Sequence, residues 1–415
     1  MNSLPVRPSG GLFFLFWILL LAESSPSQAF VSTRESLFPE TNGCCTRLYG
    51  EVPRRRFNKN LLGGLLGGEI LSFGRIHTKD ANAVAAPVAL VDVPMIRLRL
   101  PKGGFGREYI ALKMKIQDQG PFDFMIDSGL TTELISPHLQ ATLGIQSGTN
   151  QLRGIAGGGE MVNPIVDLRD VSIDTGNSKL GPVLPKLNAV ITDFPQEHID
   201  PAHDPVEGMV GMEFLSLFDV DLDFPNNRIR LFELQSTDTG GLSEIPAVVI
   251  NESMLLGIRI STPDQKNGQP ILGFLDCGST FSCINWKAAE ILGLPPKNDP
   301  LYRNGPAITA LGIDGRPLAL PTIQKELSYT GNPIFDPESK GPIGFEPPPP
   351  NWKPWDPIQI AVGDLPVFSN ILGDGVTPYQ GPAALIGLDI LAQRRVVLGT
   401  GAKNSQRRKV SISPS

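Results

Sequence analysis

Two stretches of the chain show the same order of apolar and polar positions. Residues 122–126 form an apolar, strand-like run that leads into Asp-Ser-Gly at Asp127, and residues 271–275 form a similar run that leads into Asp-Cys-Gly at Asp276. Each triplet is followed by a short segment with helical spacing that ends at a glycine. From each aspartate onward, 6 of 19 residues are identical at an offset of 149. We therefore predict one structural unit that occurs twice.

A second recurrence lies downstream of each aspartate. Residues 209–215 match residues 385–391, with two apolar residues before Gly211 or Gly387 and a hydrophobic helix start after it. The distance from the aspartate to this glycine is 84 residues in the first copy and 111 in the second. The extra 27 residues coincide with a segment at 329–357 that contains nine prolines. We predict an irregular Pro-rich insertion there.

The remaining pattern is mostly that of β-strands. Residues 96–100 and 228–232 alternate apolar and charged side chains, as half-buried strands do, and helical segments are few and short. We expect an N-terminal half at 90–234, a polar linker at 235–244, a C-terminal half at 245–400 and a frayed tail at 401–415.

Composition narrows the class of protein. The 415 residues are 41% hydrophobic and 19% charged, which supports a folded core. A net charge of −6 offers no broad basic surface, so we expect no nucleic-acid partner. Four cysteines, two of them adjacent, do not form a disulfide framework or a C-x-x-C metal pair. The 44 glycines and 39 prolines favour turns and short strands over long helices.

The first 83 residues are predicted to be targeting sequence. The apolar run at 11–22 is short for a membrane span and fits a signal peptide at 1–29 that ends at Ala29; an uncleaved anchor is the alternative. The following segment, 30–83, has the Ser, Thr and Arg content of a transit peptide. A signal peptide followed by Phe30 and such a segment resembles the two-part presequence of algae with secondary plastids.

A third targeting signal is predicted inside the transit segment. Three arginines at 54–56, a Gly-diluted apolar stretch and an A-x-A exit at 81–83 resemble a twin-arginine signal for the thylakoid lumen. The alternative is an ordinary transit peptide that ends in the stroma. Removal of residues 1–83 leaves 27 basic and 36 acidic residues, a net charge of −9. We expect a plastid location and, more specifically, sorting to the thylakoid lumen. The alternative is the secretory pathway or the extracellular space.

The duplicated Asp-x-Gly unit resembles the aspartic peptidases, of both the retroviral and the pepsin type, over nearly all of residues 90–400. The resemblance implies two retropepsin-like (acid protease) β-barrel halves in a pseudo-twofold arrangement. It also implies that Asp127 and Asp276 form a catalytic dyad. Two adjacent carboxyls share one proton, so one accepts a proton from the attacking water while the other polarises the scissile carbonyl.

The residues around the dyad support the two loops in this family. The second residue after each aspartate is a glycine because the loop turns tightly, and the downstream glycines, Gly211 and Gly387, are expected to pack behind the loops. The predicted supporting residues are Ser128, Gly129, Thr131, Cys277, Gly278 and Thr280.

Two positions depart from the family pattern. Cys277 stands where the family has Thr or Ser, so hydrogen bonding across the dyad should be weaker on that side. Leu130 replaces a small residue. These departures leave two alternatives open: an active endopeptidase, or a non-catalytic pseudopeptidase that binds a protein or peptide. Cys277 is expected to be a buried, unreactive thiol, with a redox-sensitive position as the alternative.

Two Gly-Ile segments are expected to form flaps over the dyad. They lie 27 and 36 residues after the two aspartates and comprise Gly154, Ile155, Ala156, Gly157, Gly312 and Ile313. The pepsin-type flap tyrosine is missing from both, so the retroviral type is the closer analogue.

No metal or other cofactor is expected. Residues 197–204 hold two histidines and several acids, but two prolines and the lack of helical spacing favour a solvated loop. The expected partner is a polypeptide substrate. We expect a monomer with an intramolecular pseudo-dimer and no stable membrane anchor after processing.

Overall fold

The computed structural model of the chain is mainly β. It describes residues 12–14, 18–21, 87–100, 104–147, 150–156, 159–176, 181–193, 199–200, 202–250, 254–263, 269–311, 317–338, 341–373, 377–399 and 409–415. Within these residues the strands form a 15-stranded sheet, a 10-stranded sheet and a separate two-stranded hairpin. Their buried apolar side chains form one cluster that extends through both halves. The predicted fold class is confirmed.

The first half forms the 10-stranded sheet. Its central strands run in the order β5-β6-β12-β7-β11-β9-β8. β6 pairs in parallel with β12, β12 antiparallel with β7, and β7 in parallel with β11. The strands are β2 (Ile18–Leu21), β4 (Ile96–Leu98), β5 (Tyr109–Ile116), β6 (Gln119–Ile126), β7 (Glu133–Ile135), β8 (Gln151–Ala156), β9 (Gly159–Leu168), β10 (Val171–Ile173), β11 (Leu187–Ile191) and β12 (Val206–Val210).

The second half repeats this order strand for strand. Its strands run β16-β17-β25-β18-β24-β20-β19, again with parallel, antiparallel and parallel pairs at the centre. The strands are β1 (Leu12–Phe14), β16 (Leu255–Ser261), β17 (Ile271–Leu275), β18 (Cys283–Ile284), β19 (Ala307–Leu311), β20 (Pro317–Lys325), β21 (Ser328–Tyr329), β24 (Ile358–Val362) and β25 (Ala383–Ile386). The predicted duplication of one unit is therefore present in the strand topology.

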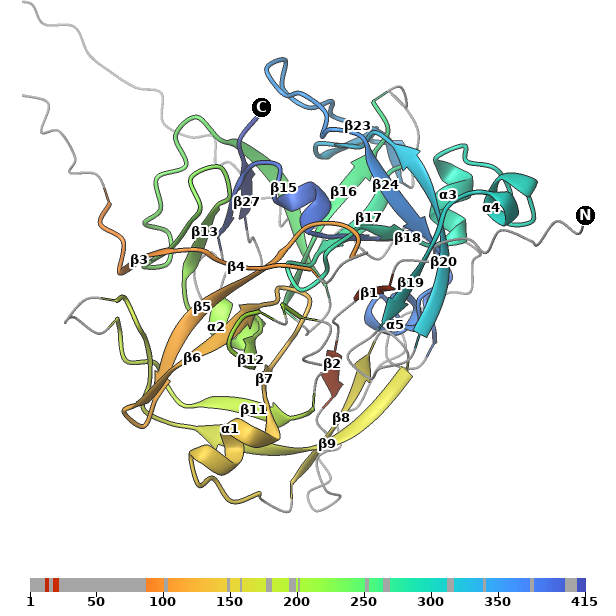
Figure 1. Ribbon diagram of the computed structural model, residues 1–415. Helices are drawn as coiled ribbons and strands as arrows, with labels where there is room; N and C mark the ends of the chain where they lie inside the picture. Colours follow the sequence, from red (N-terminus) through yellow and green to blue (C-terminus); the bar gives the residue numbers. More distant parts are fainter. Residues whose placement is uncertain are drawn as a thin grey trace, which may run out of the picture.

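A six-stranded antiparallel part of the larger sheet joins the two halves, in the order β15-β27-β26-β13-β14-β3. Figure 1 shows β13, β27 and β15 next to one another at the junction. The strands are β3 (Val91–Pro94), β13 (Asp219–Asp223), β14 (Arg228–Phe232), β15 (Ser243–Ile250), β26 (Arg395–Gly399) and β27 (Lys409–Ile412). Since β13 and β26 come from different halves, their pairing fixes the halves to each other.

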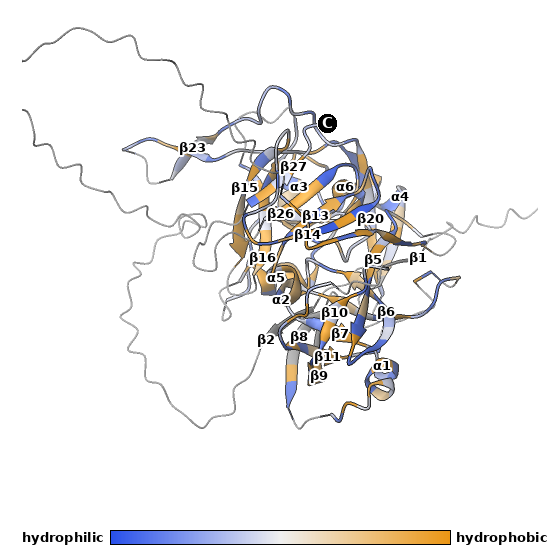
Figure 2. Ribbon diagram, turned by 90° about the vertical axis from the view of Figure 1, so that its left-hand side faces the viewer, coloured by the Kyte–Doolittle hydropathy of each residue, from blue (hydrophilic) through white to orange (hydrophobic). Residues whose placement is uncertain are grey.

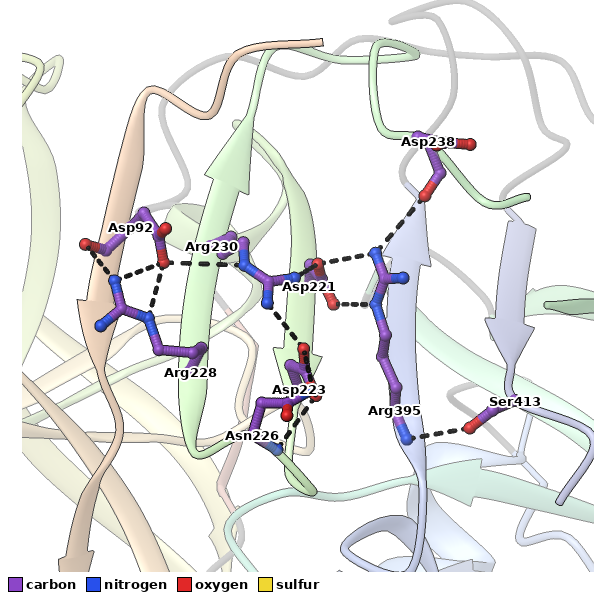
Figure 3. Close-up of polar contacts among 9 residues, drawn as sticks. All are labelled: Asp92, Asp221, Asp223, Asn226, Arg228, Arg230, Asp238, Arg395 and Ser413. Atoms are coloured by element: carbon purple, nitrogen blue, oxygen red, sulfur yellow. Dashed lines mark hydrogen bonds and ion pairs between the residues drawn. The ribbon is translucent and has the colours of Figure 1, made fainter. Parts of the chain in front are cut away.

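Charged side chains cross these joining strands in an alternating row (Figure 3). Asp221 on β13 is fully buried and lies between Arg395 on β26, at 2.9 Å, and Arg230 on β14, at 2.7 Å. The row ends at Asp92 on β3, which pairs with Arg228 at 2.7 Å. The sequence predicted β14 as a half-buried strand, and the structure shows that its charged positions bind acids on both neighbouring strands.

In the part of the chain that the structure describes, the helices are few and short, as predicted. They are α1 (Pro137–Thr142), α2 (Met212–Leu215), α3 (Trp286–Ile291), α4 (Pro300–Asn304), α5 (Pro366–Ile371) and α6 (Leu388–Leu391). α1 and α3 occupy equivalent places, each capped by a side chain, Ser136 or Asn285. They are followed by Gly144 and Gly293 at φ of +65° and +67°, a left-handed conformation that favours glycine.

Two expectations about irregular segments were wrong in part. The frayed tail ends in β27, which is paired on both sides and buries Val410 and Ile412, because β15 and β26 supply its hydrogen-bond partners. The Pro-rich insertion contains a hairpin, β22 (Pro333–Phe335) and β23 (Pro342–Phe345), which projects from the body in Figure 2. The insertion is anchored at its far end by the buried side chains of Trp352 and Trp355.

Candidate active site

Asp127 and Asp276 occupy equivalent positions in the two halves. Each follows the second strand of its half, β6 or β17, and each backbone N–H donates to the last residue of the parallel neighbour, Val210 O at 3.0 Å or Ile386 O at 2.9 Å. Both side chains are buried, at 1% and 0% exposure. The parallel pairs β6–β12 and β17–β25 thus deliver the two carboxyls to one place at the centre of the molecule.

The loop after each aspartate folds back onto its carboxylate. The N–H of Gly129 donates to Asp127 Oδ1 at 2.9 Å, and the N–H of Gly278 donates to Asp276 Oδ1 at 2.8 Å. The two remaining oxygens, Oδ2 of each aspartate, are buried and have no hydrogen-bond donor among the described residues. Each loop therefore leaves one oxygen of its carboxyl unbound.

The two glycines show that the carboxyls face each other across the junction. A Cβ at Gly129 would lie 2.6 Å from Cγ of Asp276, and a Cβ at Gly278 would overlap the carboxyl of Asp127. Each glycine thus lies against the aspartate of the opposite half. Any larger residue at either position would push the two loops apart.

Ser128 forms hydrogen bonds across the two halves. Its hydroxyl donates to the carbonyl of Leu275 at 2.9 Å and accepts from the N–H of Cys277 at 3.0 Å. Cys277 is buried, and burial raises the pKa of its thiol to about 12, so it stays protonated. A buried, protonated thiol lacks the features of a redox sensor. Cys277 and Cys283 are both free thiols.

Two other predicted supporting residues, Thr131 and Thr280, follow the two aspartates on the same loops. Thr131 and Thr280 are buried, and their carbonyls accept from backbone N–H groups, of Glu213 at 3.1 Å and of Arg107 at 2.8 Å. The downstream glycines pack behind the loops: a Cβ at Gly211 would lie 2.8 Å from Leu130 O, and one at Gly387 would overlap the carbonyl of Phe281.

Burial dominates the electrostatics of the dyad. It raises the pKa of Asp127, and it raises that of Asp276 well above its ordinary value, where the charge and proximity of Asp127 act in the same direction. Two buried carboxyls in direct contact cannot both ionise easily, so they hold a shared proton. The pair therefore combines an acid and a base.

The first predicted flap lies on a hairpin. Gly154, Ile155 and Ala156 end strand β8, which pairs with β9. β8 also contacts helix α5 of the second half. Gly157 lies outside the described residues, as do Gly312 and Ile313, which fall between β19 and β20. The flap role of these six residues stays a prediction.

Tyr109 is a candidate site residue that the sequence reasoning missed. Strands β5 and β6 are antiparallel, and Ala111 on β5 pairs with Met125 on β6. Two residues from this pair, Tyr109 lies opposite Asp127, and opposite residues share one face of the sheet. Tyr109 is fully buried, and this burial is the main cause that raises the pKa of its phenol. The charges of Asp276 and Asp127 raise the pKa further. The signal that could have found it is the 18-residue spacing from Tyr109 to Asp127 across a hairpin.

The structure gives no sign of a metal centre in the part of the chain that it describes. No group of three His, Cys, Asp or Glu side chains there could hold a metal ion. From the acidic and histidine-containing loop at 197–204, Glu197 and His198 lie outside the described residues, and His203 contacts Asp123 at 3.1 Å. Among the described helices, none is both long and apolar enough to span a membrane.

Part of the chain is similar to a known protein family. Residues 112–214 match the family model described as "Aspartyl protease". Among 325 matching chains of solved structures is basic 7S globulin from soybean, at 10% identity and a TM-score of 0.38 over 78% of this chain and 95% of that one. No curated protein matches the chain. The family match lies in the first half and includes Asp127 and Gly211, and the second half repeats the same strand order, so the first half of the chain is similar to the aspartyl proteases.

Proposed function

We propose that the chain is an aspartic endopeptidase that cleaves an extended polypeptide between Asp127 and Asp276. The observation that supports this most directly is the contact of each loop glycine with the carboxyl of the opposite half. This contact brings the two carboxyls together at the junction of the halves. Each carboxyl has one oxygen that its own loop does not bind. The unit is present in both halves, so a single chain supplies the whole site.

The reaction follows from one shared proton. The ionised carboxylate takes a proton from a water molecule, whose oxygen attacks the carbonyl carbon of the peptide bond. The protonated carboxyl donates its proton to the carbonyl oxygen, which gives a tetrahedral intermediate. The carboxyl that took the proton from water then donates it to the amide nitrogen, while the other carboxylate takes a proton from a hydroxyl of the intermediate, so the C–N bond breaks and an amine and a carboxylic acid are released. Protons balance because the dyad ends with the one proton it began with.

The raised pKa values set the expected pH range. Activity requires one proton on the pair, and burial raises the pKa of both carboxyls. The singly protonated pair therefore persists to higher pH than two ordinary carboxyls would allow, and activity is lost once the last proton leaves. We propose a working range from acidic to near-neutral pH, which suits the acidified thylakoid lumen proposed from residues 1–83; that targeting segment is almost entirely outside the described residues.

The test replaces each aspartate separately by asparagine. Asp127→Asn and Asp276→Asn should each lower cleavage of a denatured protein at pH 5 by at least about 1,000-fold, because the residues act as a unit. A single variant with undiminished activity would refute the dyad. Melting with and without a statine-type inhibitor provides a second measurement, since a competent dyad gives a pH-dependent stabilisation. An inactive wild-type protein that still binds peptides would instead support the pseudopeptidase alternative.

A further inference from the structure

Helix α2 is joined to the catalytic loop of the first half by three successive hydrogen bonds. The first three amides of α2 donate to residues 130–133, directly after the Asp127 loop. The first two reach backbone carbonyls at 2.7 and 3.1 Å. The third amide, of Phe214, reaches a side chain, Glu133 Oε1, at 2.8 Å. Glu133 thus completes the attachment of the loop to the helix behind it.

Glu133 is an acid in a position that disfavours its charge. The side chain is fully buried, and Oε2 has no hydrogen-bond partner among the described residues. The pKa of Glu133 is raised to about 8, mainly by burial and further by the charge of Glu213. Hydrogen bonds from the backbone amides of Glu133, Phe214 and Gly211 act in the opposite direction and lower the pKa. Below that pH the carboxyl is neutral and its carbonyl oxygen can accept from Phe214.

In the second half, the equivalent junction between the loop and helix α6 has different hydrogen bonds. The residue equivalent to Glu133 is Ser282, at the repeat offset of 149. Its hydroxyl donates to Asp389 Oδ1 at 2.6 Å and accepts from the N–H of Gly387 at 2.9 Å, and its own N–H donates to Asp389 Oδ2 at 2.9 Å. Both oxygens of that buried acid are therefore bound. A buried acid with one unbound oxygen occurs only at the first of these two junctions.

The groups around Glu133 do not neutralise an ionised form. Glu213 on α2 carries a like charge and is bound by the side-chain amide of Asn188, from β11, at 2.8 Å. From β12, Glu207 binds Ser136 and His138. An unpaired carboxylate in a buried site is strongly destabilised, so ionisation of Glu133 would draw water into the junction or loosen it.

We propose that Glu133 is a positioning residue that must stay protonated to hold the Asp127 loop against α2. The proposal rests on the proposed function, since the loop that it holds carries one carboxyl of the dyad. Glu133 is not expected to touch substrate. Its ionisation would disturb the loop from behind and so set an upper pH limit on the folded site, separate from the titration of the dyad.

The sign of the effect follows from the two pKa values of Glu133. The folded-state pKa of about 8 exceeds the ordinary value of 4.5, so the stabilisation from its proton is complete below 4.5 and lost as pH rises towards 8. Glu133→Gln keeps the shape and the accepting oxygen but cannot ionise. The unfolding equilibrium constant of wild type should therefore rise relative to that of the variant by about tenfold per pH unit in this window and level off above about pH 8.

The experiment is urea unfolding of the full chain, wild type and Glu133→Gln, at several pH values from 5 to 9. The matched control is Asp389→Asn in the other half. Burial raises the pKa of Asp389 to about 6, so the ratio for this control should be constant between pH 6 and 8. If Glu133→Gln does not fold, wild type is compared with Glu213→Gln instead. Loss of the like charge lowers the pKa of Glu133, so the unfolding constant of wild type relative to this variant should rise only in an interval just below pH 8. A ratio that is constant from pH 5 to 9 overturns the proposal.

Activity gives a second, separate measurement. The kcat/KM of wild type relative to Glu133→Gln should fall with a midpoint near pH 8, whereas a purely structural role gives one ratio at every pH. If the protein has no peptidase activity, the proposed function is refuted. The unfolding measurement alone then tests the role of Glu133.

Discussion

The ion pairs that join the two halves allow a direct test of what holds them together. Asp221 is fully buried, with Arg395 bonded to both of its oxygens at 2.9 Å and Arg230 to one at 2.7 Å. Asp221→Ala leaves two guanidinium groups without this partner. Breaking a buried ion pair from one side costs about 3–5 kcal/mol. Since the arginine side chains keep 23% and 26% exposure and can regain water, we expect the lower end, about 3 kcal/mol.

The assay is urea unfolding, with the free energy of unfolding compared between variants at pH 7. The control is Asp92→Ala, which removes the acid at the edge of the same row. Asp92 is 48% exposed, so its pair with Arg228 should contribute under about 1 kcal/mol and should weaken further in high salt. If Asp221→Ala costs no more than Asp92→Ala, the row of ion pairs does not hold the halves together and the backbone pairing of β13 with β26 does so alone.

Three further changes probe the dyad. Gly278→Ala should abolish cleavage and cost about 1–3 kcal/mol in urea unfolding, because the new methyl group overlaps the carboxyl of Asp127; unchanged activity would contradict the facing arrangement. Tyr109→Phe removes a phenol O–H that stays protonated beside the dyad, so the acidic limb of the kcat/KM profile should move to higher pH, while Tyr302→Phe, outside the site, should leave it in place. Cys277→Thr adds a hydroxyl that can bond across the halves and should stabilise the protein by about 1 kcal/mol, measured as a rise in the urea midpoint; a fall would show that the site cannot accommodate the hydroxyl.

Features that depend on local sequence could be predicted. The strand, the turn at Asp-x-Gly and the helix closed by Gly144 or Gly293 each follow from a few consecutive residues. Comparison of the two copies then indicated one structural unit that occurs twice, and the structure shows the same strand order in both halves. The two aspartates were identified in the same way, because the chemistry of a carboxyl pair requires the unit twice.

Features that depend on pairing between distant segments could not be predicted from the sequence. The segment at 409–412 is short and begins with a lysine, so nothing in its own sequence shows that β15 and β26 accept it as a neighbour. Tyr109 requires the register of β5 against β6 before its position opposite Asp127 is visible. The burial of Glu133 depends on α2, which lies about 80 residues further along the chain, so the residues next to Glu133 do not indicate it.

The position of β27 has a consequence for the order of folding. Its neighbours, β15 and β26, lie in the second half, and β26 in turn pairs with β13 of the first half. During synthesis the first half can form its own sheet early, but the joining sheet lacks an inner strand until residues 409–412 have left the ribosome. Contacts between the two aspartates are therefore expected to mature only after residues 409–412 have taken their place between β15 and β26.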